Sequence, residues 1–435
     1  MDGKSTVVDG RDADGVILID RRLGDIAMHL LIMSSQVVYP ATDGGKQVTY
    51  YGMSAFAKRV RVSICMVNSA DIAVEDGGFD DIHHVHIIPQ ILKPSKECGR
   101  FELMCQTMHW FLGGLPRQAL VTDSARERER LMTYIRETHV TTVLLESPFV
   151  APLLDLSQLR EWNVKIIIVL HNIEHLYFQE TTTWPAPLRS MEYERIKRYE
   201  LEILRQADLG ISISPWDAQY FKEQLGASNV VYLPSVLPCE DARWHSQDSN
   251  YTLFTGGLSF PPNYEGIIWF LEEVFSRYRE RFPEMQLWIT GKRSDVAERL
   301  ARTYDHVHLT GFLTDQELRE VECACRFIIV PILKGSGVKV KLLDAMAIGA
   351  PVVTTLHGRQ GIFGDAQKAE EPFLCGEDAD MFLQHMYVLT EDVDMATSLG
   401  ERAQHFYDTT YASEENVDKW LEVCRTSSEM ENEMC

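Results

Sequence analysis

KGSGVKVKLLDAMAIGAPVVTT, residues 334–355, contains the signals of a loop, a helix and a strand in succession. The apolar run FIIVPIL just before the first glycine predicts a buried strand that ends at this loop. The pattern that follows predicts a helix over 337–348, which Gly349 ends before the next apolar run begins. Strand, glycine-rich loop, helix and strand in this order predict parallel α/β structure.

The loop itself has the composition of an anion site. Gly335 and Gly337 let the backbone approach a ligand closely, and Ser336 is placed to cap the helix that follows. Free backbone N–H groups and the positive end of the helix dipole would then face an anion at the carboxyl edge of the sheet. A simple connecting turn can have the same composition, so the loop alone does not assign a function.

Length and charge narrow the classes of function. The chain has 435 residues, 45% of them hydrophobic and 24% charged, which is typical of a globular protein with two or three domains. Its formal net charge of −22 argues against a nucleic-acid binder, because such proteins present a basic surface. A local basic pocket for an anionic small molecule is compatible with this charge.

The sequence shows no targeting signal. Residues 1–27 are polar and acidic, unlike a secretory signal peptide, and are expected to form a flexible extension. Apolar runs stay below the roughly 18 residues that a membrane-spanning helix needs. The apolar segment 102–116 is expected to be a core or cleft helix rather than a membrane contact. Nine scattered cysteines without metal-binding spacing indicate free thiols and a cytoplasmic setting.

Short β-branched runs alternate with helical stretches, which predicts parallel sheets covered by helices. A segment rich in Pro, Asp and Ser (234–250) interrupts this alternation and marks a domain boundary. We therefore expect an N-terminal domain (28–240) and a C-terminal domain (241–435) that ends in helices. The predicted strands cover residues 29–38, 60–67, 84–89, 141–146, 164–170, 209–214 and 230–233, then 251–256, 285–291, 307–311, 327–331 and 351–355.

Two longer stretches resemble one family of enzymes. GSGVKVKLLDAMAIGAPVVTT is similar to the C-terminal donor-site motif of the retaining glycosyltransferase family 4, also called the group 1 glycosyltransferases. YTLFTGGLSFPPNYEGIIWFLEEVF (251–275) resembles the start of the C-terminal domain in one branch of that family. The resemblance extends over about residues 29–425. It implies a GT-B fold, in which two Rossmann-like domains face a central cleft.

In this resemblance the C-terminal motif binds the donor nucleotide. Asp344 stands where the family has an acidic residue that accepts hydrogen bonds from the donor ribose, although an exposed helix carboxylate is the alternative. The loop and helix start that would face the diphosphate comprise Gly335, Ser336, Gly337 and Val338. Many members carry a Glu that contacts the transferred sugar at the place of Ser336, so this contact is not carried over.

The neighbouring strands imply further donor contacts. Gly256 and Gly257 follow the first strand of the domain and would lie beside the diphosphate. VHLTGFL (307–313) matches the strand and loop that hold the nucleotide base, which makes Gly311 and Phe312 candidates for contacts with the base.

A positive charge at the donor site is expected from a lysine. This branch of the family lacks the arginine of the commoner donor loop, so Lys341 is assigned to the donor site, with Lys339 as the other choice. These lysines are two residues apart, so they lie on different faces of the helix, and at least one is expected to face solvent.

The N-terminal domain carries weaker marks of the same family. Gly44 and Gly45 form a glycine pair between the first predicted strand and helix, which in the family approaches the donor across the cleft. IIIVLHNIEHLYF (166–178) resembles the family's HN-x-E segment, whose His lies near the transferred sugar. His171 and Glu174 are therefore the catalytic candidates, although the helix dipole alone explains a carboxylate at position 174.

Metal ions and cofactors are not expected. His84 and His86 share one face of a predicted strand, but no carboxylate or cysteine stands at ligand spacing from them. The family resemblance implies chemistry that needs no metal, with the nucleotide sugar as a substrate and no cofactor.

The sequence thus predicts a glycosyltransferase that moves a sugar from a nucleotide-diphosphate sugar to a saccharide, lipid-linked or protein acceptor with retention of configuration. It would work in the cytoplasm or peripherally at a membrane. A non-catalytic GT-B subunit that binds a partner transferase or its substrate is the alternative, because Ser336 replaces the usual Glu. A GT-B epimerase would need carboxylates in the cleft, for which Glu146 and Glu174 are the weak candidates.

Overall fold

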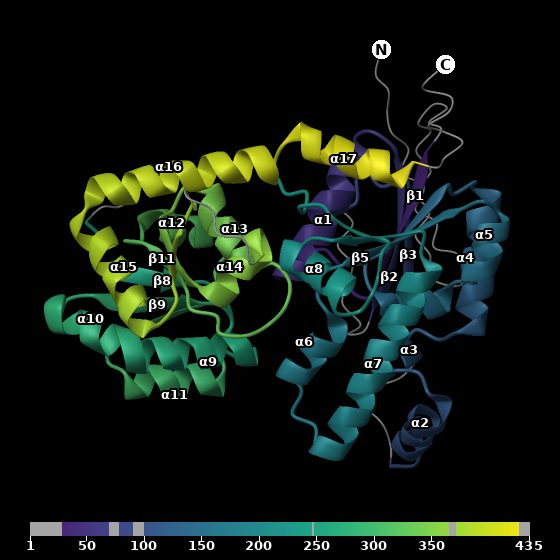
Figure 1. The fold of residues 1–435 in the computed structure, drawn as a ribbon, viewed down its shortest axis with the longest axis horizontal. Helices are drawn as coiled ribbons and strands as arrows, with labels where there is room; N and C mark the ends of the chain where they lie inside the picture. The colour runs from purple at the N-terminus through teal and green to yellow at the C-terminus, as the bar shows by residue number, and fades with distance from the viewer. Residues whose placement is uncertain (1–27, 69–77, 90–99, 246–247, 365–370, 426–435) are drawn as a thin grey trace.

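The structure, a computed structural model, describes residues 28–68, 78–89, 100–245, 248–364 and 371–425. It contains two parallel sheets, each with helices packed on it (Figure 1). The predicted extension over 1–27 lies outside the described residues. The expected α/β class, with two Rossmann-like parallel-sheet domains, is confirmed.

The N-terminal sheet has seven parallel strands in the order β3-β2-β1-β4-β5-β6-β7. Alternate residues of β1 enter two different hydrophobic clusters, so both faces of the sheet are buried. This double burial explains why the strands read as continuous apolar runs. The strands are β1 His29–Ser34, β2 Arg61–Asn68, β3 His84–Pro89, β4 Thr142–Leu145, β5 Lys165–Leu170, β6 Leu209–Ser212 and β7 Val230–Tyr232.

The C-terminal sheet has six parallel strands in the order β10-β9-β8-β11-β12-β13. The order runs from β8 to one edge and from β11 to the other, so it reverses between these two strands. Ligands of doubly wound sheets bind outside the carboxyl ends of the strands at this reversal. The strands are β8 Tyr251–Phe254, β9 Gln286–Thr290, β10 Val307–Gly311, β11 Ile328–Val330, β12 Val352–Thr355 and β13 Leu374–Gly376.

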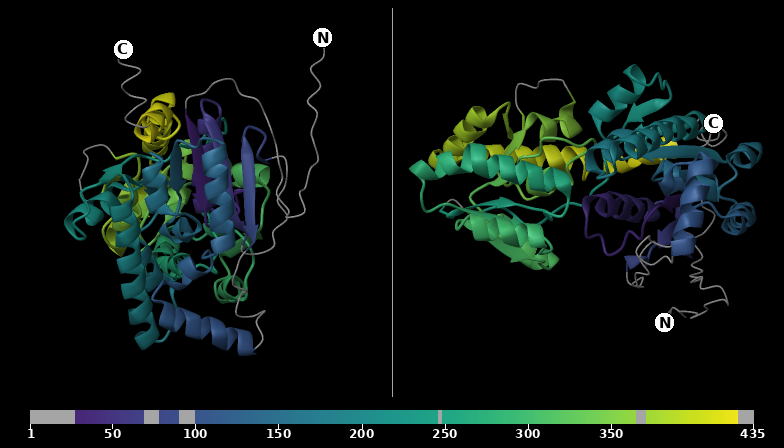
Figure 2. Two further views of the ribbon diagram at one scale, coloured as in Figure 1. Left: turned by 90° about the vertical axis from the view of Figure 1, so that its right-hand side faces the viewer. Right: turned by 90° about the horizontal axis from the view of Figure 1, so that it is seen from below.

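Helices connect the strands and cover the sheets (Figures 1 and 2). In the first domain they are α1 Gly44–Ala57, α2 Arg100–Gly113, α3 Arg117–Leu120, α4 Ala125–Glu137, α5 Leu156–Glu161, α6 Glu174–Thr181, α7 Ala186–Gln206 and α8 Pro215–Glu223. In the second they are α9 Pro261–Trp269, α10 Ser276–Arg281, α11 Asp295–Thr303, α12 Asp315–Ala324, α13 Val340–Ala347, α14 Leu356–Phe363, α15 Ala379–Glu391, α16 Val393–Thr410 and α17 Glu414–Cys424. A 3₁₀ turn, Pro148–Leu153, and a π-helical turn, Phe270–Phe275, complete the described elements.

Three features of the C-terminal domain differ from the sequence prediction. Helix α13 begins at Val340, so the predicted start at 337 is wrong. Strand β13 was not predicted because it has only three residues, too few for a pattern. Helix α14 was not predicted because the two glycines in LHGRQGIF lower its helix propensity.

Helices α16 and α17 extend from the C-terminal domain back over the N-terminal sheet (Figures 1 and 2). The carbonyl of Cys424 accepts a hydrogen bond of 2.7 Å from Thr142 Oγ1 on β4. Lys165 Nζ on β5 donates at 2.7 Å to the carbonyl of Val423. The last described helix therefore belongs to the packing of the first domain, although it follows the second in sequence.

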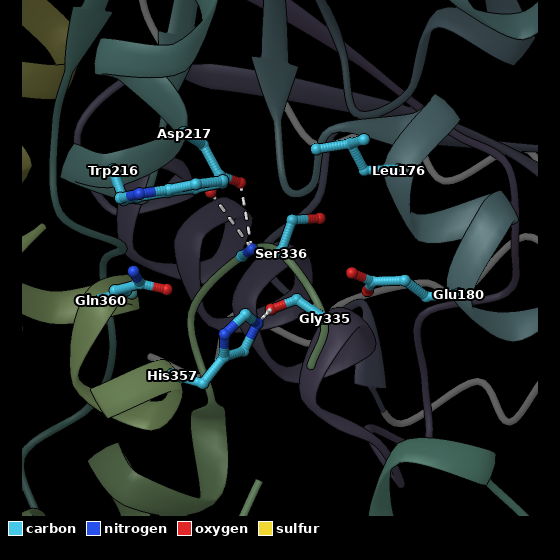
Figure 3. A pocket seen from close by; sticks show the side chains of 10 residues that line it. Leu176, Glu180, Trp216, Asp217, Gly335, Ser336, His357 and Gln360 are labelled. Atoms are coloured by element: carbon cyan, nitrogen blue, oxygen red, sulfur yellow. Dashed lines mark hydrogen bonds between the residues drawn. The ribbon is translucent and has the colours of Figure 1, made fainter. Parts of the chain in front are cut away.

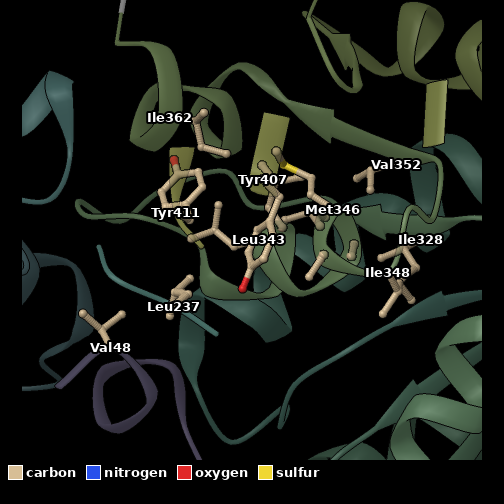
Figure 4. Packing of buried hydrophobic residues seen from close by; sticks show 14 of the residues in the cluster. Val48, Leu237, Ile328, Leu343, Met346, Ile348, Val352, Ile362, Tyr407 and Tyr411 are labelled. Carbon is tan, nitrogen blue, oxygen red and sulfur yellow. The ribbon is translucent and has the colours of Figure 1, made fainter. Parts of the chain in front are cut away.

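The hydrophobic core continues from one domain into the other (Figure 4). Val48 on α1, Leu237 between the domains and Leu343 on α13 belong to one cluster of buried side chains. This shared core indicates that the two domains stabilise each other.

Trp420 on α17 tests how strongly the terminal helix supports the N-terminal domain. Its side chain is buried, its ring lies 6.0 Å from that of Phe56, and its Nε1 donates to the carbonyl of Pro234. We expect Trp420→Ala to lower the free energy of unfolding by about 3–5 kcal/mol in urea denaturation. Lys419→Ala, at a neighbouring exposed position, is the control and should change it by less than about 0.5 kcal/mol. Equal effects of the two substitutions would contradict the structural role of α17.

Candidate functional site

Glycine loops form the carboxyl edge of the C-terminal sheet. Gly256 and Gly291 follow β8 and β9, and Gly311 is the last residue of β10, with φ values of +131°, +110° and +79°. A Cβ on Gly291 would come within 2.9 Å of the backbone nitrogen of Gly257, and the nitrogen of Gly291 donates to the carbonyl of Gly311 at 3.1 Å. The edge is therefore made of backbone, and exposed Phe312 stands beside it. Such an edge suits a flat or anionic ligand that approaches the main chain closely.

Lys341 brings positive charge to the reversal point between β8 and β11. Its Nζ donates to Asn263 Oδ1 at 2.7 Å and lies 4.3 Å from the centre of the Phe254 ring. Asn263 Nδ2 in turn donates to the carbonyl of Gly257 at 2.9 Å. A Cβ on Gly256 would come within 3.0 Å of Nζ. Burial lowers the pKa of Lys341 to about 7, so an anion bound here would favour its charged form.

Lys339 supports the loop after β11 from within. Its Nζ donates to the carbonyls of Gly335 at 2.7 Å, Ser336 at 3.0 Å and Gly337 at 3.0 Å. Lys339 is also the N-cap residue of α13, which begins at Val340 without a side-chain cap. The predictions that Ser336 caps this helix and that one of the two lysines faces solvent are both wrong.

The same loop is held from the N-terminal domain. The nitrogen of Gly337 donates at 3.0 Å to Oδ2 of Asp217, a buried carboxylate in the first turn of α8 that also accepts from Ser214 Oγ at 3.1 Å. The hydroxyl of Ser336 accepts at 3.1 Å from the nitrogen of Ile173, at the start of α6. The N–H of Gly337, expected to be free for an anion, is therefore already bonded in this structure.

Gly337 also touches the end of β5 directly. With φ at +76°, a Cβ here would come within 2.4 Å of the carbonyl oxygen of His171 and 2.6 Å of Asn172 Oδ1. No other residue type fits without displacing the backbone of the first domain. A second close contact joins the helix starts, because a Cβ on Gly44 would lie 2.8 Å from Val340 Cγ2. At Gly45 the nearest atoms would be 3.5 Å away or more, which leaves ordinary space.

His171 and Glu146 form a pair at the carboxyl ends of β5 and β4. His171 Nε2 lies 2.5 Å from Glu146 Oε2, which also accepts from Thr49 Oγ1 at 3.0 Å. Burial acts to lower the pKa of His171. The hydrogen bond and charge of Glu146, together with the charge of Glu174, outweigh burial and raise that pKa above 6.5. The pair can hold a proton near neutral pH, as a general acid requires.

Glu174 lies next to a second buried pair under the start of α6. Burial and the nearby Glu200 raise the pKa of Glu174 to about 8. Glu200 accepts from the nitrogen of Glu174 at 2.9 Å and lies 2.7 Å from His175 Nδ1. The carboxylate of Glu200 thus supports the first turn of α6, while that of Glu174 is half-buried beside His171.

Asp344 is the carboxylate expected to accept hydrogen bonds from the ribose of the nucleotide sugar. It is half-buried on α13, and no hydrogen bond to it is found in the parts of the chain that the structure describes. Burial raises its pKa to about 6, against the opposing charges of Arg319 and Lys341. The alternative of an exposed helix carboxylate does not fit this placement. Its role toward a ribose stays a prediction, as do the roles of the other site residues.

A small cavity of about 30 Å³ borders the loop on the side of α6, α8 and α14 (Figure 3). Carboxylates of Glu180 and Asp217 and the ring of His357 line it, and His357 Nε2 lies 3.0 Å from the carbonyl of Gly335. The remaining lining residues are Leu176, Trp216, Gly335, Ser336, Gly337, Gln360 and Gly361. The loop is therefore accessible from the interdomain side as well as from the sheet edge.

The sequence analysis did not single out several residues that build this site. Asp217 and Glu200 lie on buried faces of α8 and α7, where a carboxylate among apolar neighbours was the available signal. Asn263 was quoted within the PPN stretch but given no role. Glu146 was named only for an epimerase.

The predicted absence of a metal site is not tested by this structure. Among the described residues, no three His, Cys, Asp or Glu side chains are placed to hold a metal ion. The rings of His84 and His86 instead pack against Tyr134, and burial lowers their pKa values to about 4 and about 3.

The two Rossmann-like parallel-sheet domains have the GT-B fold, which solved glycosyltransferase structures share. Within it, residues 249–392 match the family model described as "Glycosyl transferases group 1". The C-terminal half therefore carries a group 1 glycosyltransferase domain.

Several known proteins are similar to this chain over most of its length. An "Uncharacterized 44.6 kDa protein in cps region" of Klebsiella pneumoniae is 24% identical over 395 residues, covering 88% of this chain and 96% of the relative. Sucrose-phosphate synthase from Thermosynechococcus elongatus has a TM-score of 0.65 at 18% identity, over 91% of this chain and 98% of its own. Anabaena HepE, solved in complex with UDP, has a TM-score of 0.64 at 13% identity, over 91% and 99%. These structural likenesses establish the fold.

Gly337 and Gly335 form a matched pair for testing the interdomain contact. Both have positive φ, but a Cβ on Gly335 would meet nothing nearer than 3.8 Å, whereas one on Gly337 would collide with His171. Each alanine substitution should cost about 1–2 kcal/mol for the left-handed backbone. We expect Gly337→Ala to cost at least about 2 kcal/mol more than Gly335→Ala in urea denaturation, because backbone must also move. Indistinguishable costs would show that the two domains do not meet at Gly337.

The pKa of His171 tests its pairing with Glu146. Removing the carboxylate leaves burial as the leading influence, so the pKa of His171 should fall from above 6.5 in the wild type to below 6.5 in Glu146→Gln. NMR titration of ¹³C-labelled histidines measures it directly. His385, whose pKa is lowered by burial on α15, should be unaffected and serves as the internal control. An unchanged pKa of His171 in Glu146→Gln would show that the two side chains do not interact.

Proposed function

We propose that this protein transfers a sugar from a nucleoside-diphosphate sugar to an acceptor hydroxyl, with retention of anomeric configuration and without a metal ion. The observation that carries the proposal is the buried network of Lys341, Asn263 and the carbonyl of Gly257 at the strand reversal of a group 1 glycosyltransferase domain. A buried lysine beside bare backbone is a site for a phosphate oxygen. The UDP bound to the structurally similar HepE supports a nucleotide ligand of this kind.

The donor is bound along the C-terminal sheet edge in this proposal. The base rests against Gly311 and Phe312, and Asp344 accepts hydrogen bonds from the ribose hydroxyls. The diphosphate lies between Gly256 and the start of α13, near Lys341. As the glycosidic bond breaks, the leaving diphosphate gains negative charge. A lysine held in place beforehand stabilises that charge without reorganisation, which is electrostatic preorganisation.

The transferred sugar and the acceptor meet at the end of the N-terminal sheet. His171, kept protonated by Glu146, donates to an oxygen of the transferred sugar. Glu174, whose pKa is raised to about 8, acts in its ionised form as the general base: it takes the proton of the acceptor hydroxyl as that oxygen bonds to the sugar carbon and the diphosphate leaves. The contacts of Gly337 with His171 and Asp217 keep the domains closed, which limits hydrolysis of the donor by water.

The acceptor is proposed to be a saccharide, free or attached to a lipid or protein carrier. The K. pneumoniae relative from a cps region accords with a saccharide product, although its own activity is not part of its description. We further propose a cytoplasmic protein that associates peripherally with a membrane when the acceptor is carried by a lipid.

A non-catalytic GT-B subunit is the second candidate function. Ser336 stands where many members of family 4 carry a Glu, and its hydroxyl is engaged by Ile173 rather than facing a free site. In such a subunit the closed domain contact would serve the binding of a partner transferase or its substrate. Slow release of nucleoside diphosphate from a donor sugar separates the candidates, because only the enzyme hydrolyses its donor.

Binding of nucleoside diphosphates tests the donor site. We expect isothermal titration of UDP, GDP and ADP to find one that binds, and Lys341→Met to weaken that binding about 10- to 150-fold, the value of a charge-assisted hydrogen bond. Asp344→Asn should also weaken nucleotide binding, because the proposed hydrogen bonds from the ribose hydroxyls to the carboxylate would be lost. Lys334→Met is the control, because Lys334 lies near the same loop but pairs with Glu265. Failure of all three nucleotides to bind, or equal affinity in Lys341→Met, would overturn the donor site.

A further inference from the structure

Helix α2 presents an apolar face that no described residue covers. Met104, Met108, Phe111 and Leu112 are 52%, 55%, 57% and 75% exposed. Met108, Phe111 and Leu112 follow Met104 by four, seven and eight residues, which places all four side chains on one side of the helix. Figure 1 shows α2 at the far end of the N-terminal domain, away from the C-terminal domain. The expectation of a core or cleft helix at 102–116 is therefore wrong for this face.

The opposite side of α2 is fixed to the domain. Trp110 is buried, and its Nε1 donates at 2.8 Å to Oε2 of Glu192 on α7. Arg195 donates to the carbonyls of Trp110 at 2.7 Å and Phe111 at 2.9 Å, and its guanidinium lies 5.1 Å from the Trp110 ring. Polar contacts thus close the last turn of the helix. The apolar face is a fixed feature of the surface.

The surroundings of this face are basic, in contrast to the chain as a whole. Residues 186–198 at the start of α7 contain four Lys or Arg and two Glu, and Arg117 follows α2. The chain carries a formal charge of −22. Arg117 and Arg189 are exposed. The carboxylate of buried Glu192 accepts hydrogen bonds from Trp110 Nε1 and from the backbone nitrogen of Arg117. Exposed Leu188 adds apolar surface on the first turn of α7.

An apolar helix face bordered by arginines fits the interface of a membrane that contains anionic lipids. The apolar side chains enter the boundary between headgroups and acyl chains, and basic residues near the surface are attracted to the anionic headgroups. No helix within the described ranges is long and apolar enough to cross a membrane, so contact would be at the surface. A second copy of this chain fits less well, because it would bring two arginine clusters and two strongly acidic molecules together.

We propose that the α2 face, made of Met104, Met108, Phe111, Leu112 and neighbouring Leu188, docks onto an anionic lipid surface. The inference rests on the peripheral association in the proposed function and assigns it to residues. Docking there would bring the domain that holds His171 to the membrane, where a lipid-linked acceptor lies.

Vesicle co-sedimentation of the full chain tests the docking, without donor or acceptor. We expect binding to phosphatidylcholine vesicles with about 30% phosphatidylserine and weak or no binding to phosphatidylcholine alone. Met108→Glu with Phe111→Glu should abolish binding, and Arg117→Glu with Arg189→Glu should weaken it at least about tenfold. Met381→Glu with Val388→Glu on α15 is the matched control, since both are exposed apolar residues, and should bind as the wild type does.

Two results would overturn the proposal. One is a wild type that does not bind the anionic vesicles, or binds them equally well after the α2 substitutions. The other is a wild-type dimer, seen by light scattering after gel filtration, that the Met108→Glu and Phe111→Glu pair converts to monomers, which would make the face a self-interface. Nucleotide affinity of the α2 variants should equal that of the wild type, so failure of docking is distinguishable from failure of the donor site.

Discussion

The close approach of Gly337 to the carbonyl of His171 determines how the two domains meet. A Cβ would come within 2.4 Å of that oxygen, so the loop after β11 fits against the end of β5 only with glycine at this position. The N–H of Gly337 then reaches Asp217, and the hydroxyl of Ser336 reaches the nitrogen of Ile173. Each of these bonds crosses from one sheet to the other. In this closed arrangement these bonds set the position of the loop after β11 relative to the His171–Glu146 pair.

Buried charges, rather than apolar side chains, hold the loop in this contact. Lys339 binds the carbonyls of the loop from one side, and Asp217 binds an N–H from the other. Burial lowers the pKa of Lys339 and raises that of Asp217, while each charge favours the other. Lys339 keeps its bonds to the loop carbonyls, and Asp217 keeps those from Ser214 and Gly337, so the two charges act on the loop from opposite sides.

Periodicity and glycine placement predicted the two sheets because the strands are buried on both faces and their apolar runs are local signals. The loop after β11 was predicted from its glycines, whereas donor contacts at Gly256 and Gly311 were expected from the family resemblance and stay predictions. Contacts between distant segments had no such signal. Lys339 bonds to carbonyls of the loop before α13, and Glu200 on α7 supports a helix that begins 26 residues earlier. The exposure of α2 could not be predicted either, since an apolar stripe reads the same whether it is buried or not.

Negative charge near the loop comes from the N-terminal domain. Ser336 carries none, and the neighbouring carboxylates of Glu180 and Asp217 belong to α6 and α8. Glu180 Oε2 lies 3.8 Å from the Cβ position of Gly335, and Asp217 is bonded to Gly337. A separated C-terminal domain would lose both. The charge around the loop therefore depends on domain closure in this protein, whereas a carboxylate at position 336 would supply it in either state.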